Sequence, residues 1–156
     1  MGEQHLMVER NGPIWLKICM VIPGRDPEVV MSWFTDARLL HRWWIGEADV
    51  DPTIGGVYVM GWPTTDWTMR GRVIRCQPME LIYSWSWEHE CEQPARAVLI
   101  RTEADGADTR VSIVHGPYRT SATDVVSERT ELETHRAGWM ASLPNLMRVL
   151  TGTVNA

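Results

Sequence analysis

Five strand-like segments with very short connectors occupy the middle of this chain, and they restrict its possible folds more than any other feature. The segments are 57–62, 68–75, 81–87, 96–102 and 110–115. Each is rich in β-branched or aromatic residues, and turn-forming sequences such as PTTD, CQPM and ADGAD separate several of them. Connectors of this length join neighbouring antiparallel strands, whereas parallel strands need longer crossovers. The sequence therefore predicts an antiparallel meander.

One more strand and two short helices are predicted before the meander. Residues 14–22 are apolar and rich in isoleucine, and the turn-forming sequence PGRDP follows them. Helices are predicted over 27–34 and 37–43, because Pro27 suits a first helical turn and Asp36 can cap the second helix. These elements give the sheet a first strand and helices that can pack beside it.

A long amphipathic helix is predicted over 130–150. Its apolar residues recur at spacings of three and four, and they are Trp139, Leu143, Leu146, Met147 and Leu150. Such a stripe can cover the apolar face of a curved sheet. Because 156 residues is the usual size of one domain, we expect a single domain over 14–151, with tails at 1–13 and 152–156.

The sequence LIYSWSWEHE, residues 81–90, places very large side chains on one face of a strand. With a period of two, Tyr83, Trp85 and Trp87 share that face. Core packing and the lining of a ligand cavity both remain open for these residues, because either role buries aromatic surface. Alternation and helical spacing extend the candidate ligand-binding set to Tyr83, Trp85, Trp87, Met60, Trp62, Met69, His115, Trp139, Leu143 and Met147.

Few residues offer familiar catalytic or metal-binding chemistry. The sequence has no HExxH, no paired CxxC, no GxSxG elbow and no phosphate-binding glycine loop. Glu131 and His135 lie one helical turn apart, but two ligands do not make a metal site, so we expect no metal and no cofactor. His115, Tyr83 and Arg72 are the candidates for acid–base chemistry. Non-catalytic binding is therefore favoured over catalysis.

Charge and hydropathy indicate which classes of partner to expect. The formal net charge is −5 and no stripe of Lys and Arg is present, so a nucleic-acid partner is not expected. No stretch approaches the roughly 20 apolar residues that span a bilayer, and the N-terminus has no signal-peptide pattern, so no membrane partner is expected. The 3 cysteines lie far apart, which fits reduced thiols. We expect a cytoplasmic protein.

Five local sequences resemble, in order, the motifs of one superfamily. They are TDARLLHRWW, IGGVYVM, RGRVIRCQPMELIYSW, TRVSIVHG and GWMASLPNL. The chain resembles the SRPBCC or START-like superfamily over residues 14–150, and within it the branch named for the activator of the Hsp90-type chaperone ATPase. The resemblance implies an α+β helix-grip fold. In this fold a curved seven-stranded antiparallel sheet surrounds a long C-terminal helix, two short helices follow the first strand, and a cavity lies between sheet and helix.

The resemblance implies several functions, because members of this superfamily do different things with one fold. They include lipid carriers, polyketide aromatases and cyclases, co-chaperone domains and a self-sacrificing resistance protein against an enediyne antibiotic. The leading hypothesis is binding of an apolar, aromatic or polyketide-like small molecule. The alternatives are a cyclase, aromatase or dehydratase, a self-resistance protein that sequesters a toxic natural product or is cleaved by it, and a chaperone-interacting module.

Two departures from the family pattern bear on these alternatives. Residues 117–130 differ from the family motifs and form a candidate lid over the cavity. The chain also lacks the additional N-terminal domain of the eukaryotic co-chaperone, so a chaperone contact is not expected. The identity of the ligand and the presence of a homodimer remain open at this point.

Overall fold

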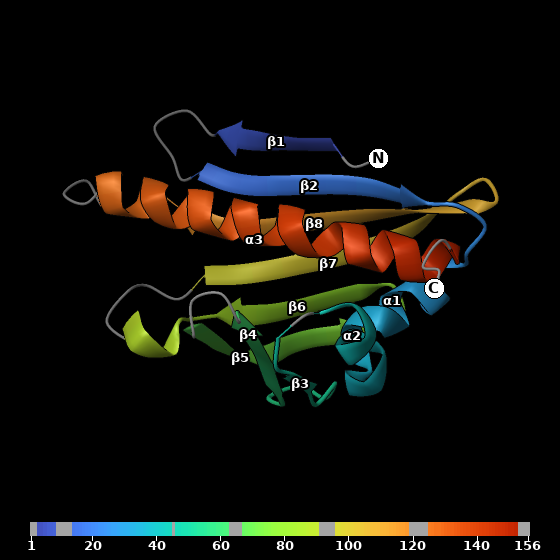
Figure 1. Ribbon diagram of the computed structural model, residues 1–156, viewed down its shortest axis with the longest axis horizontal. Coiled ribbons are helices and arrows are strands. Elements are labelled where there is room, and N and C mark those ends of the chain that lie inside the picture. The colour runs from blue at the N-terminus through green and yellow to red at the C-terminus, as the bar shows by residue number, and fades with distance from the viewer. Residues whose placement is uncertain are drawn as a thin grey trace.

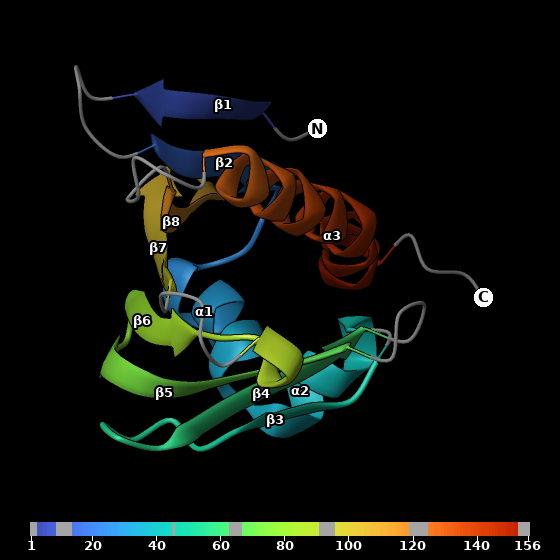
Figure 2. The same cartoon turned by 90° about the vertical axis from the view of Figure 1, so that its left-hand side faces the viewer.

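The computed structural model describes residues 3–8, 14–44, 46–62, 67–90, 96–118 and 125–152. Within these ranges an antiparallel sheet curves around one long helix, with two short helices at one end (Figures 1 and 2). The sheet has eight strands in the order β1-β2-β8-β7-β6-β5-β4-β3. The strands are β1 (Glu3–Val8), β2 (Ile14–Ile22), β3 (Ala48–Val50), β4 (Val57–Trp62), β5 (Trp67–Gln77), β6 (Glu80–Trp85), β7 (Arg96–Asp105) and β8 (Asp108–Tyr118). The helices are α1 (Pro27–Thr35), α2 (Ala37–Trp43), the single 3-10 turn η1 (Glu88–Glu90) and α3 (Val125–Thr151).

The predicted fold class is confirmed, with one more strand than expected. Strand β1 lies in the segment interpreted as an N-terminal tail and pairs antiparallel with β2, from Glu3 opposite Cys19 to Val8 opposite Ile14. Strand β3 was also not predicted, because three residues are too few to display a period of two. Both are edge strands, so the meander predicted from the sequence forms the centre of the sheet.

The ends of several elements differ from the predicted ends. Strand β6 stops at Trp85, and Trp87 pairs with Met69 through an isolated bridge. Helix α3 begins at Val125 instead of residue 130, which adds more than a turn to its N-terminal end. This extra turn places Glu128 on the helix, in the part of the chain interpreted as a lid.

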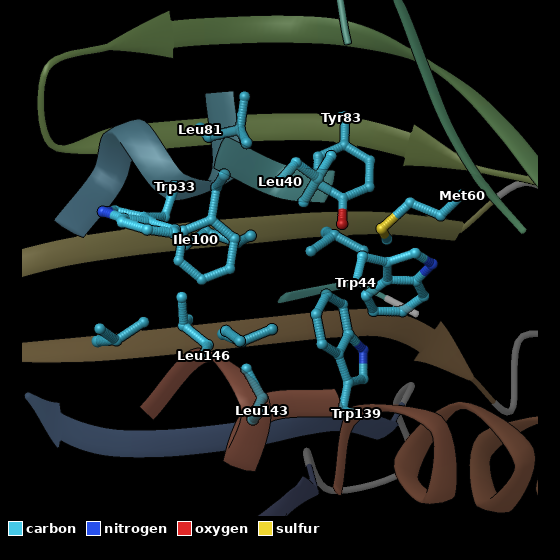
Figure 3. Packing of buried hydrophobic residues seen from close by; sticks show 14 of the residues in the cluster. Trp33, Leu40, Trp44, Met60, Leu81, Tyr83, Ile100, Trp139, Leu143 and Leu146 are labelled. Atoms are coloured by element: carbon cyan, nitrogen blue, oxygen red, sulfur yellow. The ribbon is translucent and has the colours of Figure 1, made fainter. Parts of the chain in front are cut away.

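The core lies between the concave face of the sheet and the helices. Trp33, Leu40 and Trp44 come from the α1–α2 segment, while Leu143 and Leu146 reach the same core from α3 (Figure 3). The indole N–H of Trp44 donates to the carbonyl of Gly61 at 2.9 Å. A buried indole N–H usually has an acceptor, and here that acceptor belongs to β4. The bond therefore joins the segment after α2 to β4. No helix among the described residues is long and apolar enough to cross a membrane.

Candidate functional site

A cluster of buried polar and aromatic side chains lies beneath the N-terminal half of α3. It combines residues of β6 and the segment just after it, of β7, of β8 and of α3. We call it the histidine cluster, and its members are Trp85, Trp87, Arg96, His115, Tyr118, Glu128, Glu131, His135 and Trp139. All of them are buried except Glu131, which is partly buried. Polar groups this deep in a domain have specific partners or a specific use.

Two imidazole rings form the centre of the histidine cluster. His115 from β8 and His135 from α3 stack with ring centroids 4.5 Å apart and an interplanar angle of 4°. Trp85 packs on both rings, with centroids 4.5 Å from His115 and 5.0 Å from His135. Neither histidine is exposed at all. The stack therefore joins the sheet to the C-terminal helix inside the protein.

The hydrogen bonds of His135 define where its proton lies. The indole N–H of Trp87 donates to His135 Nε2 at 3.0 Å, and an indole can only donate. Nε2 is therefore unprotonated, so the neutral ring carries its proton on Nδ1 and donates it to the Tyr118 hydroxyl oxygen at 2.6 Å. Burial, with a smaller contribution from the positive charge of Arg96, lowers the pKa of His135 to about 3. His135 is uncharged at neutral pH.

His115 has the opposite tautomer. The indole N–H of Trp139 donates to His115 Nδ1 at 3.0 Å, so the proton of the neutral ring is on Nε2. Burial lowers the pKa of His115 well below its usual value, and His135 and Arg96 add to this effect. Among the described residues, His115 Nε2 has no hydrogen-bond partner. A buried donor without a partner typically costs about 1–3 kcal/mol, which makes this atom stand out.

Tyr83 provides a second polar atom of this kind. Its side chain is fully buried, and its hydroxyl has no hydrogen-bond partner in the described part of the chain. Figure 3 shows this hydroxyl pointing from β6 towards Trp44 and Trp139. The phenol ring stacks on Tyr58 at 3.9 Å, but the Tyr58 hydroxyl donates to the Phe34 carbonyl at 2.7 Å. Two adjacent buried tyrosines thus differ in whether the hydroxyl has a partner among the described residues.

This difference between the two tyrosines gives a stability prediction. Replacing Tyr58 with phenylalanine leaves the Phe34 carbonyl without its donor and is expected to lower the free energy of unfolding by about 1–2 kcal/mol. Replacing Tyr83 with phenylalanine removes an unpaired hydroxyl and is expected to leave stability unchanged or raised. Urea denaturation of both variants measures the difference. Equal losses would show that the Tyr83 hydroxyl is paired in the free protein.

Arg96 forms a buried ion-pair group at the edge of the histidine cluster. Its Nε and Nη2 donate to the two carboxylate oxygens of Glu131 at 3.2 and 2.7 Å. Glu128 lies 3.4 Å away, and Nη1 donates to the Pro117 carbonyl. The guanidinium carbon also lies 5.0 Å from the centroid of the Tyr118 ring. Arg96 therefore ties β7, the end of β8 and the first turns of α3 together.

The structure brings most of the sequence-predicted ligand-binding residues into the interior. Met60 and Met69 face each other across β4 and β5, and both are buried. Met147 is partly buried against the core. The other buried members of the predicted set are Tyr83, Trp85, Trp87, His115, Trp139 and Leu143. The side chain of Trp62 lies outside the described part of the structure.

Arg72 does not join the interior residues. Met69, Gly71 and Val73 face the core, so the alternation along β5 directs Arg72 to the outer surface. There its guanidinium donates to the Gly55 carbonyl at 3.2 Å. This placement removes Arg72 from the candidate acid–base residues, because the side chain points away from His115 and Tyr83.

The candidate lid and metal ligands are only partly described. Within the segment 117–130, residues 119–124 lie outside the described ranges and 125–130 form the start of α3. Glu131 and His135 approach each other, with 3.8 Å between Oε2 and Nε2. No group of three or more side chains suited to a metal ion occurs among the described residues.

Sequence reasoning missed Tyr118 and Arg96. Alternation from His115 directs residue 118 outward, but the pairing of β2 with β8 shifts register between Ile14 and Leu16, and Tyr118 turns inward. Arg96 begins a strand, where a charged residue is normally exposed. Glu128, Glu131 and His135 have the helical spacing of one face, and this spacing is the signal that could have revealed the polar face of α3.

Comparison with known proteins gives a family match and several matching folds. The model of the family described as Activator of Hsp90 ATPase homolog 1-like protein matches residues 25–151. The crystal structure of CalU16 from Micromonospora echinospora has a TM-score of 0.69 at 22% identity, over 99% of this chain and 86% of CalU16. An HSP90 activator from Plasmodium falciparum, PFC0360w, has a TM-score of 0.66 at 21% identity, over 90% of this chain and 97% of that one.

A third matching structure is that of a protein described as part of a biosynthetic locus. DynU16, described as a protein in the dynemicin biosynthetic locus, has a TM-score of 0.66 at 18% identity, over 88% of this chain and 47% of DynU16. At these sequence identities, the three structures show that this chain has the same fold and nothing more. Comparison with curated proteins finds no match. Because the family model covers most of the sequence, including the histidine cluster, the chain belongs to the family of Activator of Hsp90 ATPase homolog 1-like proteins.

Proposed function

We propose that this protein binds an apolar small molecule, aromatic or polyketide-like, between the sheet and α3. The observation that carries the proposal is the Nε2–H of His115, which lies in a fully buried, aromatic interior and finds no acceptor among the residues that the structure describes. A donor in such a position is costly unless something accepts from it. A guest with an apolar body and few polar atoms matches the usual composition of ligand sites.

The walls around this donor suit an apolar guest. Trp85 packs against His115, and Met69, which bridges to Trp87, pairs with Met60 across β4 and β5. Aromatic rings offer large contact areas, and methionine side chains adapt to irregular shapes. The fold supports the same proposal, because one structure with this fold belongs to a protein of a biosynthetic locus.

The contact between Trp139 and His115 limits where a guest can enter. Their hydrogen bond joins α3 directly to β8, and Trp85 lies 6.1 Å from Trp139 between ring centroids. At this level the helix and the sheet touch. A guest that keeps this hydrogen bond therefore needs other side chains between α3 and the sheet, near Tyr83 and Met60, to move aside.

Fluorescence titration tests the proposal. We expect aromatic and polyketide-like compounds to quench the tryptophan emission with saturable binding, because the guest would contact Trp85. Replacing Trp85 with leucine is expected to weaken binding at least tenfold. The smaller side chain removes much of the aromatic contact area between residue 85 and the guest. Isothermal titration calorimetry gives the dissociation constants independently of the fluorophore.

The matched control is Trp33, another buried tryptophan. It lies in α1 beside Arg42 and is not part of the histidine cluster. Trp33→Leu is expected to keep the wild-type affinity. An equal loss in both variants, or no binding of any member of a chemically broad panel, would contradict the proposal.

Catalysis on the bound guest is the second candidate, and the His135–Tyr118 pair favours it. Tyr118 accepts the Nδ1 proton of His135, so its own hydroxyl proton is free to be donated to a substrate oxygen. The Nδ1–H of His135 stays on the ring and stabilises the negative charge left on the tyrosine oxygen, until the tyrosine takes a proton back from the substrate. A cyclase or dehydratase needs such a transfer. Mass spectrometry after incubation with stoichiometric protein separates the two functions, because a binding protein returns its ligand unchanged.

A further inference from the structure

We infer that the guest is a neutral aromatic ketone or quinone, whose carbonyl oxygen accepts a hydrogen bond from His115 Nε2 with the Tyr83 hydroxyl as a second donor. This inference rests on the proposed function and names the ligand class of the same site. The tautomer of His115, the placement of Tyr83 and the charges of the histidine cluster each support it.

The tautomer restricts the guest to an acceptor. Because Trp139 occupies Nδ1 of His115 as a donor, Nε2 must carry the proton and can only donate. A guest group that can only donate, such as an ammonium or a pyrrole-type N–H, would face another donor there. A pure hydrocarbon would offer no acceptor to the N–H of His115, which also has none in the described part of the chain. A carbonyl oxygen, with two lone pairs and no proton, pairs with it.

The placement of Tyr83 supports a flat guest lying over β7. Tyr83 pairs with Val98, and Val98 pairs with His115, so the three residues form one row across β6, β7 and β8. All three face the interior, and all three are completely buried. The Cα atoms of Tyr83 and His115 are therefore two strand spacings apart, about 10 Å. Fused rings lying on Val98 can reach both donors.

The charges of the histidine cluster exclude an anionic acceptor. Both imidazoles are neutral, because burial lowers the pKa of each. Arg96, the cation of the described cluster, is already paired with Glu131 and Glu128. A carboxylate or phosphate would be buried without a counter-charge, which is far more costly than burying a neutral carbonyl.

The experiment compares two guests of nearly the same shape, 9-fluorenone and fluorene. They differ by one carbonyl oxygen, so the ratio of their dissociation constants measures recognition of the acceptor. We expect wild-type protein to bind fluorenone at least tenfold more tightly than fluorene. Infrared spectra of bound fluorenone should show the carbonyl stretch shifted to lower frequency than in an apolar solvent.

Three variants locate the donors. His115→Phe keeps an aromatic ring in the stack but removes the N–H, and it is expected to remove most of the preference for fluorenone and to reduce the infrared shift. Tyr83→Phe removes the second hydroxyl and is expected to reduce the preference severalfold. Tyr58→Phe, the matched control, removes a hydroxyl that is already bonded to the Phe34 carbonyl and is expected to keep the preference.

The outcomes separate this inference from the proposed function. If fluorenone and fluorene bind equally well, or if His115→Phe keeps the preference, the ligand class is overturned while binding of an apolar guest stands. If neither compound binds and no other apolar aromatic compound does, the proposed function falls and the inference falls with it. Circular dichroism of each variant identifies any that fails to fold, and ¹⁵N spectra of His115 in wild-type protein then test the Nε2–H tautomer directly.

Discussion

Replacing Arg96 with methionine is expected to lower the free energy of unfolding by about 3–5 kcal/mol, because the change leaves buried carboxylates without their cation. Arg96 and Glu128 are almost completely buried, and Glu131 holds the guanidinium through both oxygens. Methionine fills much of the volume of arginine but donates no hydrogen bond. The Pro117 carbonyl would also lose its partner. Chemical denaturation at neutral pH measures the loss.

Arg101 offers a control on the same strand. It pairs with Glu80 at 2.6 Å, but the arginine side chain is 56% exposed. Exposed pairs contribute about 0–1 kcal/mol, so Arg101→Met is expected to change stability by less than 1 kcal/mol. Similar losses in the two variants would mean that burial of the Arg96 group does not determine its contribution. If Glu131→Gln restores stability to Arg96→Met, the loss in the single variant comes from a buried carboxylate without its cation.

The amino-acid pattern predicted the parts of the fold that repeat. Strand β4 and helix α2 begin and end where alternation and capping place them, because each residue in a regular element repeats the same signal. Three-residue β3 has no room for a repeat. Strand β1 begins with the polar residues Glu3, Gln4 and His5, so its sequence lacks the alternation of apolar and polar residues that predicts a strand.

The candidate site was harder to predict, because it depends on interactions between distant residues. His115 was predicted to face inward, and it does, but its partner Trp139 lies 24 residues away along the chain. The inward turn of Tyr118 depends on a register shift, and alternation cannot reveal such a shift in advance. Sequence patterns therefore placed Tyr83, Trp85 and Trp87 on one inward face. Only the packing of α3 on β8 showed the buried pair of His115 and His135.

Acidification from pH 6.5 to pH 5 is expected to destabilise the protein by about 2 kcal/mol through His135 alone, since one proton changes stability by about 1.4 kcal/mol per pH unit. The usual pKa of 6.5 falls to about 3 in the folded protein, mainly through burial. Below pH 6.5 the unfolded chain thus binds a proton that the folded chain does not. Stability is complete above pH 6.5 and falls until about pH 3. His115 has a pKa lowered in the same direction and adds to the loss.

The groups that face His135 do not reverse this sign. Glu131 approaches Nε2 to 3.8 Å and would favour a protonated ring, but its carboxylate is already bound to Arg96. Arg96 opposes protonation. Trp87 donates to Nε2, so a proton there would break that bond. Tyr118 contacts the ring through Nδ1 and is neutral in this range, because burial raises its pKa well above the usual value.

Urea denaturation of three proteins between pH 7 and pH 5 tests this expectation. His135→Phe has no titrating group at this position. Its free energy of unfolding should therefore change less steeply with pH than that of the wild type, by the equivalent of about one proton taken up on unfolding, whatever its absolute stability. Tyr58→Phe, which changes no group that titrates between pH 5 and pH 7, provides the control and should keep the wild-type slope. An unchanged slope in His135→Phe would mean that the ring at position 135 takes up a proton in the folded protein as readily as in the unfolded one. In that case the Trp87–His135–Tyr118 hydrogen bonds would not hold the neutral tautomer, and the proton transfer from Tyr118 would lose its basis.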